Sequence, residues 1–136
     1  MVLYYYSFTG FILPGLPEQK EDEIMDERLC SMEAEFFKAL AHPTRVRILK
    51  LLRDGEKCVC EFTEDLDIEQ SNMSQHLGIL RKQNIVRSRK EGLKVIYSVV
   101  YPQIFEIIDL VEDIIISQVN ETLNLLNKRP KRKGGE

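Results

Sequence analysis

Two cysteines one residue apart are the side chains of this 136-residue chain that offer the most distinctive chemistry. Cys58 and Cys60 follow a turn at Gly55 and precede a short helix that we expect to begin near Glu61. The positive end of a helix dipole favours the thiolate form of a nearby cysteine, and thiolates bind soft metals and metalloids. Two sulfurs do not complete a stable site, so Cys30 is the candidate third ligand, from the same chain or from a second copy. The plainer interpretation is that Cys58 and Cys60 are buried packing residues.

Oxidation is the alternative chemistry of the same thiols. A bridge between Cys58 and Cys60 would close a small, strained ring, so we expect Cys30 to be the better disulfide partner for either of them. Three cysteines are an odd and low number, which does not indicate a secreted disulfide framework. The apolar start of the chain lacks the basic residues and the cleavage site of a signal peptide. We therefore expect a cytoplasmic protein with reduced thiols.

A helix with a polar exposed face is predicted to start near Gln70, just after the cysteine region. Met73, Leu77 and Leu80 fall at i, i+4 and i+7 and predict one buried stripe. The opposite face carries short amide and hydroxyl groups, which can donate to and accept from base edges in a major groove. We expect a phosphate contact or a structural hydrogen bond from a histidine of the same helix. The candidate DNA contacts of this helix are Gln70, Ser71, Asn72, Ser74, Gln75 and His76.

A basic hairpin is predicted to follow, with strands at 86–90 and 94–98 joined by a turn at Glu91 and Gly92. Between Gln70 and Tyr101 six basic residues stand against one acid, although the whole chain has a formal net charge of −3. A short helix at 61–66, a polar helix and a basic wing form the pattern of a winged helix-turn-helix that binds double-stranded operator DNA. The basic residues expected to contact DNA are Arg81, Arg87, Arg89, Lys90 and Lys94.

The remaining elements must position these two regions. A first helix should run from about Ile24 to Leu40, and a second from Pro43 to Arg53, because proline suits the first turn of a helix. The second helix is expected to bury Val46, Leu49 and Leu52. His42, at the junction between the two helices, is interpreted as a structural residue.

A long final helix is predicted from about Gln103 to Leu126. Its apolar residues recur at steps of three or four and form a stripe broader than one small domain can cover, which indicates a helical homodimer interface. The stripe consists of Ile104, Ile107, Ile108, Leu110, Val111, Ile114, Ile115, Ile116, Val119, Leu123 and Leu126.

The chain is thus predicted to be mainly α-helical with a small β-hairpin wing. We divide it into an N-terminal extension at 1–31, a winged helix-turn-helix domain with a C-terminal dimerisation helix at 32–127, and a basic, disordered tail at 128–136. No run of about 18 apolar residues indicates a membrane span, so no membrane partner is expected. No phosphate-binding loop, nucleophile–histidine–acid set or paired carboxylates indicate an enzyme. A winged helix that binds a protein is the alternative class, and the basic bias of the DNA-contacting region argues against it.

Two stretches, ALAHPTRVRILKLLRDGEKCVCEF and QSNMSQHLGILRKQNIVRSRKEGLKVIYSV, resemble the ArsR/SmtB family of metal-sensing winged-helix repressors. The resemblance covers 36–99 well and the last helix loosely. It implies a homodimer that blocks a promoter when empty and leaves it when loaded. In such repressors the stretch corresponding to 56–62 is the inducer site for arsenite, antimonite, cadmium or lead.

This chain departs from the family pattern in two places. Thr63 and Glu64 stand where one branch of arsenite sensors has a third cysteine, and the last helix has no histidine for the zinc site of other members. Cadmium and lead sensors of the family draw extra thiolates from an N-terminal arm, and Cys30 could supply one. As(III) is the favoured inducer, because three soft sulfurs suit it, with Cd(II) or Pb(II) as alternatives and no organic cofactor. A thiol-redox repressor of the same fold is the other function that the residues allow.

Overall fold

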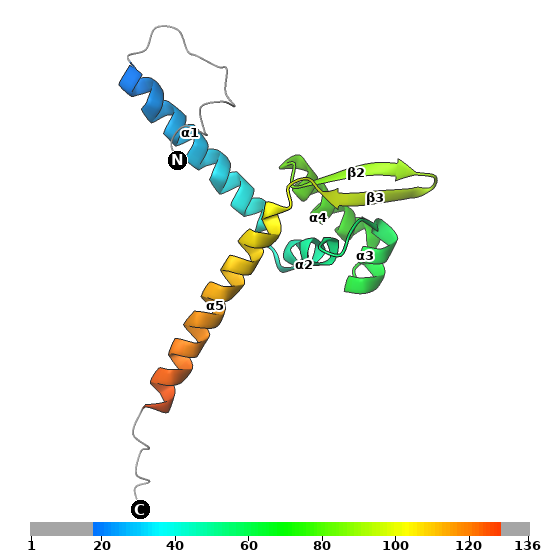
Figure 1. The fold of residues 1–136 in the computed structure, drawn as a ribbon. Coiled ribbons are helices and arrows are strands. Elements are labelled where there is room, and N and C mark those ends of the chain that lie inside the picture. The colour runs from blue at the N-terminus through cyan, green and yellow to red at the C-terminus, as the bar shows by residue number, and fades with distance from the viewer. Residues whose placement is uncertain (1–17, 129–136) are drawn as a thin grey trace, which may run out of the picture. The chain divides into compact units, whose positions relative to one another are not determined.

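The computed structural model describes residues 18–128, except the side chains of residues 18, 19 and 21 (Figure 1). The chain divides between Lys38 and Ala39 into two compact units. The elements, in chain order, are α1 (Glu18–Leu40), α2 (Pro43–Leu52), β1 (Lys57–Cys58), α3 (Val59–Leu66), α4 (Gln70–Lys82), β2 (Val86–Glu91), β3 (Lys94–Val99) and α5 (Gln103–Asn127). The apolar start at 1–17 and all but the first residue of the basic tail lie outside the described residues.

Among the described residues, the first unit consists of α1 up to Lys38; this helix of 23 residues starts earlier than the sequence pattern indicates, and its last two residues belong to the second unit. Lys38 Nζ donates to Glu35 Oε1 at 2.6 Å, and the rings of Phe36 and Phe37 pack edge to face. Large apolar side chains of this helix are nevertheless exposed, Met32 among them. The expectation of a helix that continues to Leu40 is confirmed.

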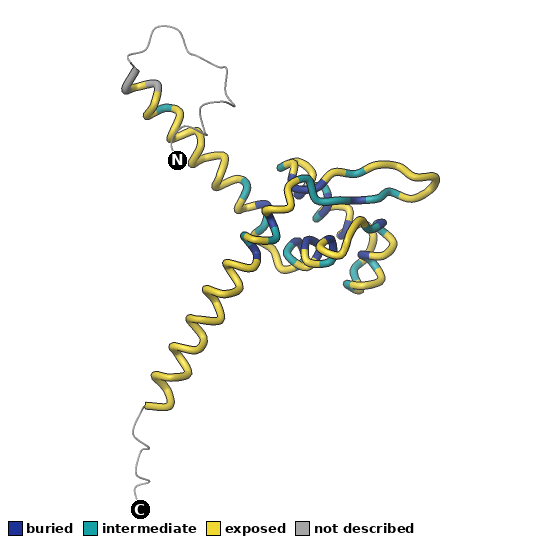
Figure 2. Tube along the Cα trace, in the orientation of Figure 1, coloured by how far each residue is buried: buried dark blue, intermediate teal, exposed yellow. Residues whose placement is uncertain are grey.

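The core of the second unit is formed by α2, α3, α4 and the start of the hairpin, where Figure 2 shows the buried positions gathered. The predicted α4 stripe is confirmed, because Met73, Leu77 and Leu80 are fully buried. The prediction for α2 was wrong in one position: Val46 is only half-buried and Ile48 is fully buried. The buried face of α2 follows i, i+3, i+4 and i+7 through 45, 48, 49 and 52, which leaves Val46 at its edge.

The three strands form one antiparallel sheet in the order β1-β3-β2. The hairpin register runs from Val86 opposite Val99 to Glu91 opposite Lys94, and Gly92 takes the left-handed conformation that this turn requires, with φ at 61°. The hairpin prediction is confirmed. The sequence did not reveal β1, because two residues are too few to show an alternating pattern.

Helix α5 packs on α2 through its first turns only. Ile104 and Ile108 are buried, while Arg53 donates to both carboxylate oxygens of Asp109 and Lys50 Nζ donates to Glu112 Oε2 at 2.6 Å. Beyond these contacts the helix is exposed to its end, as Figure 2 shows. Within the described residues, no helix combines the length and apolar character needed to cross a membrane.

Candidate nucleic-acid interface and cysteine pair

The turn between α3 and α4 fixes the direction of the candidate reading helix. Asp67 ends α3 in the left-handed conformation with φ at 51°, and Ile68 N–H donates to Thr63 O at 3.3 Å. Phe62 of α3 is fully buried, as is the Met73–Leu80 stripe of α4. The two helices are thereby held by a shared core, with α4 starting at Gln70 as the sequence predicts.

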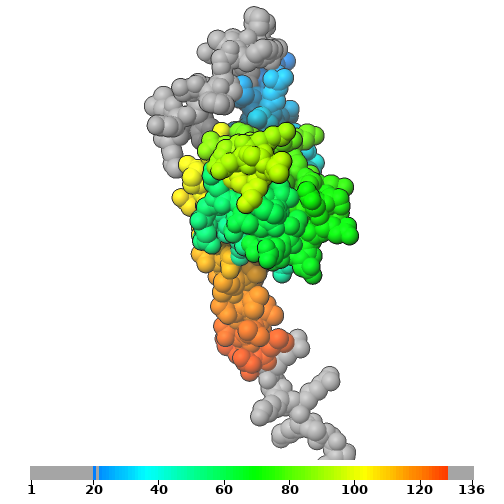
Figure 3. Space-filling view, turned by 90° about the vertical axis from the view of Figure 1, so that its right-hand side faces the viewer, coloured from blue at the N-terminus to red at the C-terminus, as the bar shows by residue number. Residues whose placement is uncertain are grey.

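The polar side of α4 is available to a partner. Five of the six candidate contacts on this helix are exposed: Gln70, Ser71, Asn72, Ser74 and Gln75. In the space-filling view of Figure 3, side chains of α4 and of the β2–β3 hairpin are visible on the same face of the second unit. We call this hairpin, residues 86–99, the wing. A protruding polar helix beside a basic hairpin is the arrangement that enters a major groove and contacts the flanking phosphates.

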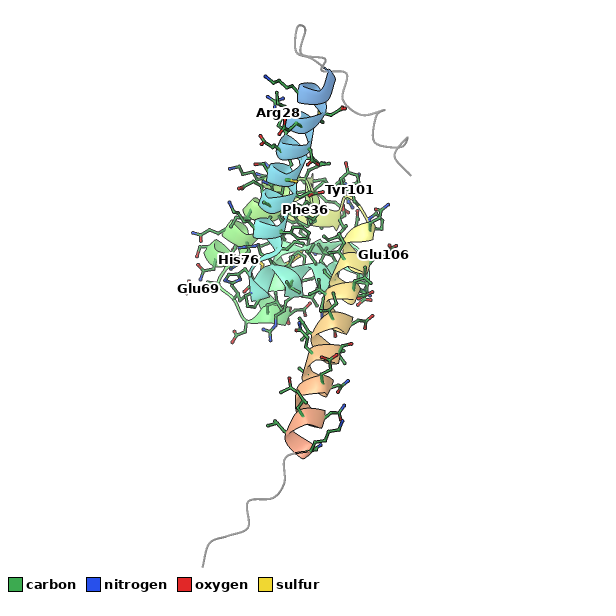
Figure 4. All side chains as sticks on the ribbon, turned by 90° about the vertical axis from the view of Figure 1, so that its left-hand side faces the viewer. Arg28, Phe36, Glu69, His76, Tyr101 and Glu106 are labelled. Carbon is green, nitrogen blue, oxygen red and sulfur yellow. A yellow bond between two sulfur atoms is a disulfide. The ribbon has the colours of Figure 1, made fainter. Side chains whose placement is uncertain are left out.

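The sixth candidate, His76, is turned toward the protein. It is half-buried, its ring centroid lies 4.4 Å from that of His42, and its Nδ1 has no hydrogen-bond partner among the described residues. Burial, followed by the charges of His42 and Arg45, lowers the pKa of His76. His42 caps α2, because its Nδ1 accepts from Thr44 N–H at 3.1 Å, so the structural interpretation of His42 is confirmed. Figure 4 labels His76 on α4.

The basic residues of the interface differ in how strongly they are already bound. All five candidates are exposed, but Arg89 donates to Glu56 Oε1 and Oε2 at 2.6 and 2.7 Å and to Glu91 at 3.2 Å. The side-chain hydrogen bond from Arg89 lowers the pKa of Glu56. Arg87 Nε donates to Ser98 at 3.2 Å and Arg81 to Ser88 at 3.5 Å. Sequence reasoning did not select Glu56, because its partner lies 33 residues away and no local pattern joins them.

The cysteine pair lies at the start of α3. Cys58 is the residue before the first helical turn and is buried, whereas Cys60 is exposed within that turn. The helix therefore begins at Val59, two residues earlier than predicted, because Glu61 Oε2 accepts from Cys58 N–H at 2.7 Å and closes the first turn there.

The bonding of the three cysteines differs from the sequence-based expectation. Cys58 and Cys60 form a disulfide, and Cys30 is a free, exposed cysteine of the first unit. The expectation that Cys30 would be the better partner was wrong, because the strand-to-helix turn brings the two Cα atoms to 5.3 Å, a separation that a disulfide can span. No three histidine, cysteine or acidic side chains in the part of the chain that the structure describes are grouped so that they could hold a metal ion. Only after reduction of this disulfide could the pair supply two thiolate ligands to a soft ion, which would need others to complete its site.

Comparison with known proteins gives a consistent result. Residues 42–88 match the family described as bacterial regulatory protein, arsR family. The chain is 39% identical over 101 residues to the HTH-type transcriptional regulator Rv0081 of Mycobacterium tuberculosis H37Rv, which covers 74% of this chain and 89% of the relative. The crystal structure of M. tuberculosis Rv0081 has a TM-score of 0.64 at 38% identity, covering 70% of this chain and 96% of that chain.

Two further relatives are similar over a shorter part of the chain. Reduced HlyU from Vibrio cholerae N16961 has a TM-score of 0.59 at 32% identity over 66% of this chain and 95% of that chain. The arsenic resistance transcriptional regulator ArsR1 of Pseudomonas putida KT2440 is 40% identical over 74 residues, which are 54% of this chain and 57% of the relative. Rv0081 and ArsR1 are transcriptional regulators and not enzymes, so the predicted non-enzymatic function is confirmed. The helices and the small antiparallel sheet confirm the predicted winged helix-turn-helix fold.

Proposed function

This chain belongs to the ArsR family of bacterial regulatory proteins, and from that premise we propose that its homodimer represses transcription by binding double-stranded operator DNA through α4 and the wing. The observation that carries the proposal is the way in which α4 is packed: its apolar side faces the core and its polar side faces the solvent. Its apolar stripe is fully buried, and the five polar side chains at 70–72, 74 and 75 are exposed beside a hairpin rich in arginine and lysine. Base edges accept hydrogen bonds from such side chains and donate hydrogen bonds to them, and phosphates attract the positive charges of the neighbouring arginine and lysine residues.

The proposed homodimer is supported by the apolar surface of α5. An α5 pair would cover side chains that are about half exposed in one chain, Ile115 and Val119 among them. Burial of such surface contributes about 25 cal/mol per Å², which is the main favourable term in the association of two helices. Two reading helices related by two-fold symmetry would then meet two half-sites about one DNA turn apart.

The proposed inducer is a thiophilic metal or metalloid, with As(III) favoured over Cd(II) and Pb(II). Cys58 and Cys60, when reduced, would hold such an ion as two thiolate ligands. Cys30 remains the candidate for a third. We propose a cytoplasmic location for this activity, because the thiols must be reduced to bind the ion and cytosolic thiols are kept reduced.

The connections of the cysteine pair support a route by which a change there would alter DNA binding. Cys58 pairs with Ile96 of β3, and Ile96 pairs on its other side with Arg89 of the wing. Cys60 lies in the first turn of α3, whose far end leads into α4. A rearrangement of the two sulfurs therefore acts on both DNA-contacting elements. A coupling free energy of about 1–3 kcal/mol would change operator occupancy 5- to 150-fold.

A second candidate function is repression controlled by thiol oxidation. The observation in its favour is the disulfide between Cys58 and Cys60, which needs no third ligand. Oxidation would join the same two sulfurs that a soft ion would bring together, so both candidates use the same connections to α3 and the wing.

One experiment tests the repressor proposal and separates the two inducers. An operator is first selected from a pool of random duplexes by the reduced wild-type protein. Gel shifts then measure release by arsenite, Cd(II), Pb(II), zinc and peroxide, with dithiothreitol to reverse the peroxide effect. Release by arsenite under reducing conditions supports the metalloid, and release by peroxide alone supports oxidation. Failure to select any duplex would overturn the repressor proposal.

Three cysteine variants locate the response. Cys58→Ser and Cys60→Ser should each retain operator binding, because neither thiol lies in the proposed DNA contact. Each should lose release by the ion, because one sulfur of the pair cannot hold it. Cys30→Ser is the matched control, since it removes one thiol from the first unit. A lost response in Cys30→Ser supports a three-thiolate site, and a retained response limits the site to the pair. If the double variant of Cys58 and Cys60 still releases DNA with the same ion, the pair is not the inducer site.

A further inference from the structure

The guanidinium of Arg89 is held by a carboxylate that is not part of the wing. Glu56 lies just before β1 and accepts two hydrogen bonds, at 2.6 and 2.7 Å, from the two terminal nitrogens of Arg89. This is the fork geometry by which an arginine also grips a phosphate. A phosphate cannot bind the edge of the guanidinium formed by its two terminal nitrogens while Glu56 occupies it, so the two compete for that edge.

The pair is exposed, and this decides how it can act. The side chains of Arg89 and Glu56 are 51% and 45% exposed, so water screens their attraction and the bond can open without a large cost. Glu56 also places a negative charge near a surface that would face the DNA backbone. The hydrogen bond from Arg89 keeps that charge in place by lowering the pKa of Glu56.

We infer that Glu56 is an intramolecular competitor of the DNA backbone: it occupies Arg89 in the free protein and weakens DNA binding until a phosphate displaces it. This rests on the proposed DNA contact of the wing. Of the two acids that bind Arg89, Glu56 makes two short bonds and Glu91 makes one at 3.2 Å. Glu91 is thus an internal control of equal charge and weaker contact.

The test measures binding of a fluorescein-labelled 30-base-pair duplex of random sequence by anisotropy at several KCl concentrations. Glu56→Gln should tighten binding about two- to fivefold, the size expected for losing one exposed ion pair. The slope of log K against log salt should change by much less than the value of about 0.9 expected for one phosphate, because Arg89 engages the same phosphate in both complexes. Glu91→Gln should produce less than half of the Glu56→Gln gain.

Arg89→Ala decides whether the effect passes through the pair. In the Arg89→Ala background, Glu56→Gln should change affinity by less than about 1.5-fold at physiological ionic strength. Without Arg89, the charge of Glu56 acts on the DNA phosphates only from a distance, where salt screens it. Equal gains from Glu56→Gln with and without Arg89, or equal gains from the two glutamate variants, would overturn the inference in favour of a general charge effect. So would no gain at all. A wild-type protein that binds no duplex would instead overturn the proposed function itself.

Discussion

Helices α4 and α5 are both amphipathic, but the apolar side of α4 is buried and most of the apolar side of α5 is exposed. In α4 the apolar stripe is fully buried in the domain core, and the exposed side is polar. In α5 only Ile104 and Ile108 are buried, Ile107 is half-buried, and the stripe from Leu110 onward is exposed. The exposed apolar residues are Leu110, Val111, Ile114, Ile115, Ile116, Val119, Leu123, Leu125 and Leu126.

This difference indicates two kinds of partner. A helix with its apolar side already covered presents hydrogen-bonding groups, which suit a base edge. A helix with its apolar side uncovered presents a surface that gains from being removed from water, which suits a second copy. In the view of Figure 4, Glu69 before α4 and His76 of α4 lie on the opposite side of the second unit from Glu106 of α5.

The largest expected effect concerns α5. Ile115→Glu should convert dimers to monomers in sedimentation velocity, because an unpaired charge in a buried interface costs about 3–5 kcal/mol. Ile115 is 52% exposed in one chain and so tests the interface, whereas Ile108 is 8% exposed and its replacement would also disturb the domain core. Ser117→Glu adds the same charge to the other side of the helix and should leave the dimer intact. A dimeric Ile115→Glu protein would place the interface elsewhere.

The next effect concerns the core under α4. Leu77→Ala should lower the free energy of unfolding by about 2–5 kcal/mol, since the side chain is fully buried. Leu93, at the tip of the wing, is fully exposed, and Leu93→Ala should change the free energy of unfolding by no more than about 0.5 kcal/mol. Urea unfolding of both variants measures the difference. Similar losses would show that the α4 stripe is not the core that positions the reading helix.

A smaller effect separates base contacts from phosphate contacts. Ser74→Ala or Gln75→Ala should weaken binding to the selected operator by about 1–3 kcal/mol and leave random duplexes unchanged. Lys90→Ala should weaken binding to both and reduce the salt slope by about 0.9. Anisotropy titrations with the two duplexes measure these changes. If the Ser74 and Gln75 variants lose equal affinity for both, α4 is not the reading helix.

The smallest effect is a pH dependence from His76. Because burial lowers its pKa in the folded protein, the unfolded chain takes up a proton at a higher pH than the folded one. The stability contributed by neutral His76 is therefore complete above the unfolded pKa of about 6.5 and decreases as pH falls below it. His76→Gln should flatten the fall in urea midpoint between about pH 7 and about pH 5.5. An unchanged slope would mean that other groups cause it.

The sequence predicted α4 and the wing well because their determinants are local. The Met73, Leu77 and Leu80 spacing, and the glycine turn between two basic strands, each lie within one element. What the sequence missed depends on residues brought together by folding. The bond between Glu56 and Arg89 joins residues far apart in the chain, and β1 exists only because β3 lies beside it. The inward turn of His76 likewise depends on His42 of another element.

We propose that two chains together read one operator through α4. The most direct test titrates the selected operator and a random duplex of equal length with reduced wild-type protein at physiological salt, while sedimentation measures the mass of each complex. We predict two chains per operator and an affinity at least about 10³-fold tighter than for the random duplex. Equal affinity for both duplexes, or one chain per operator, would contradict the claim.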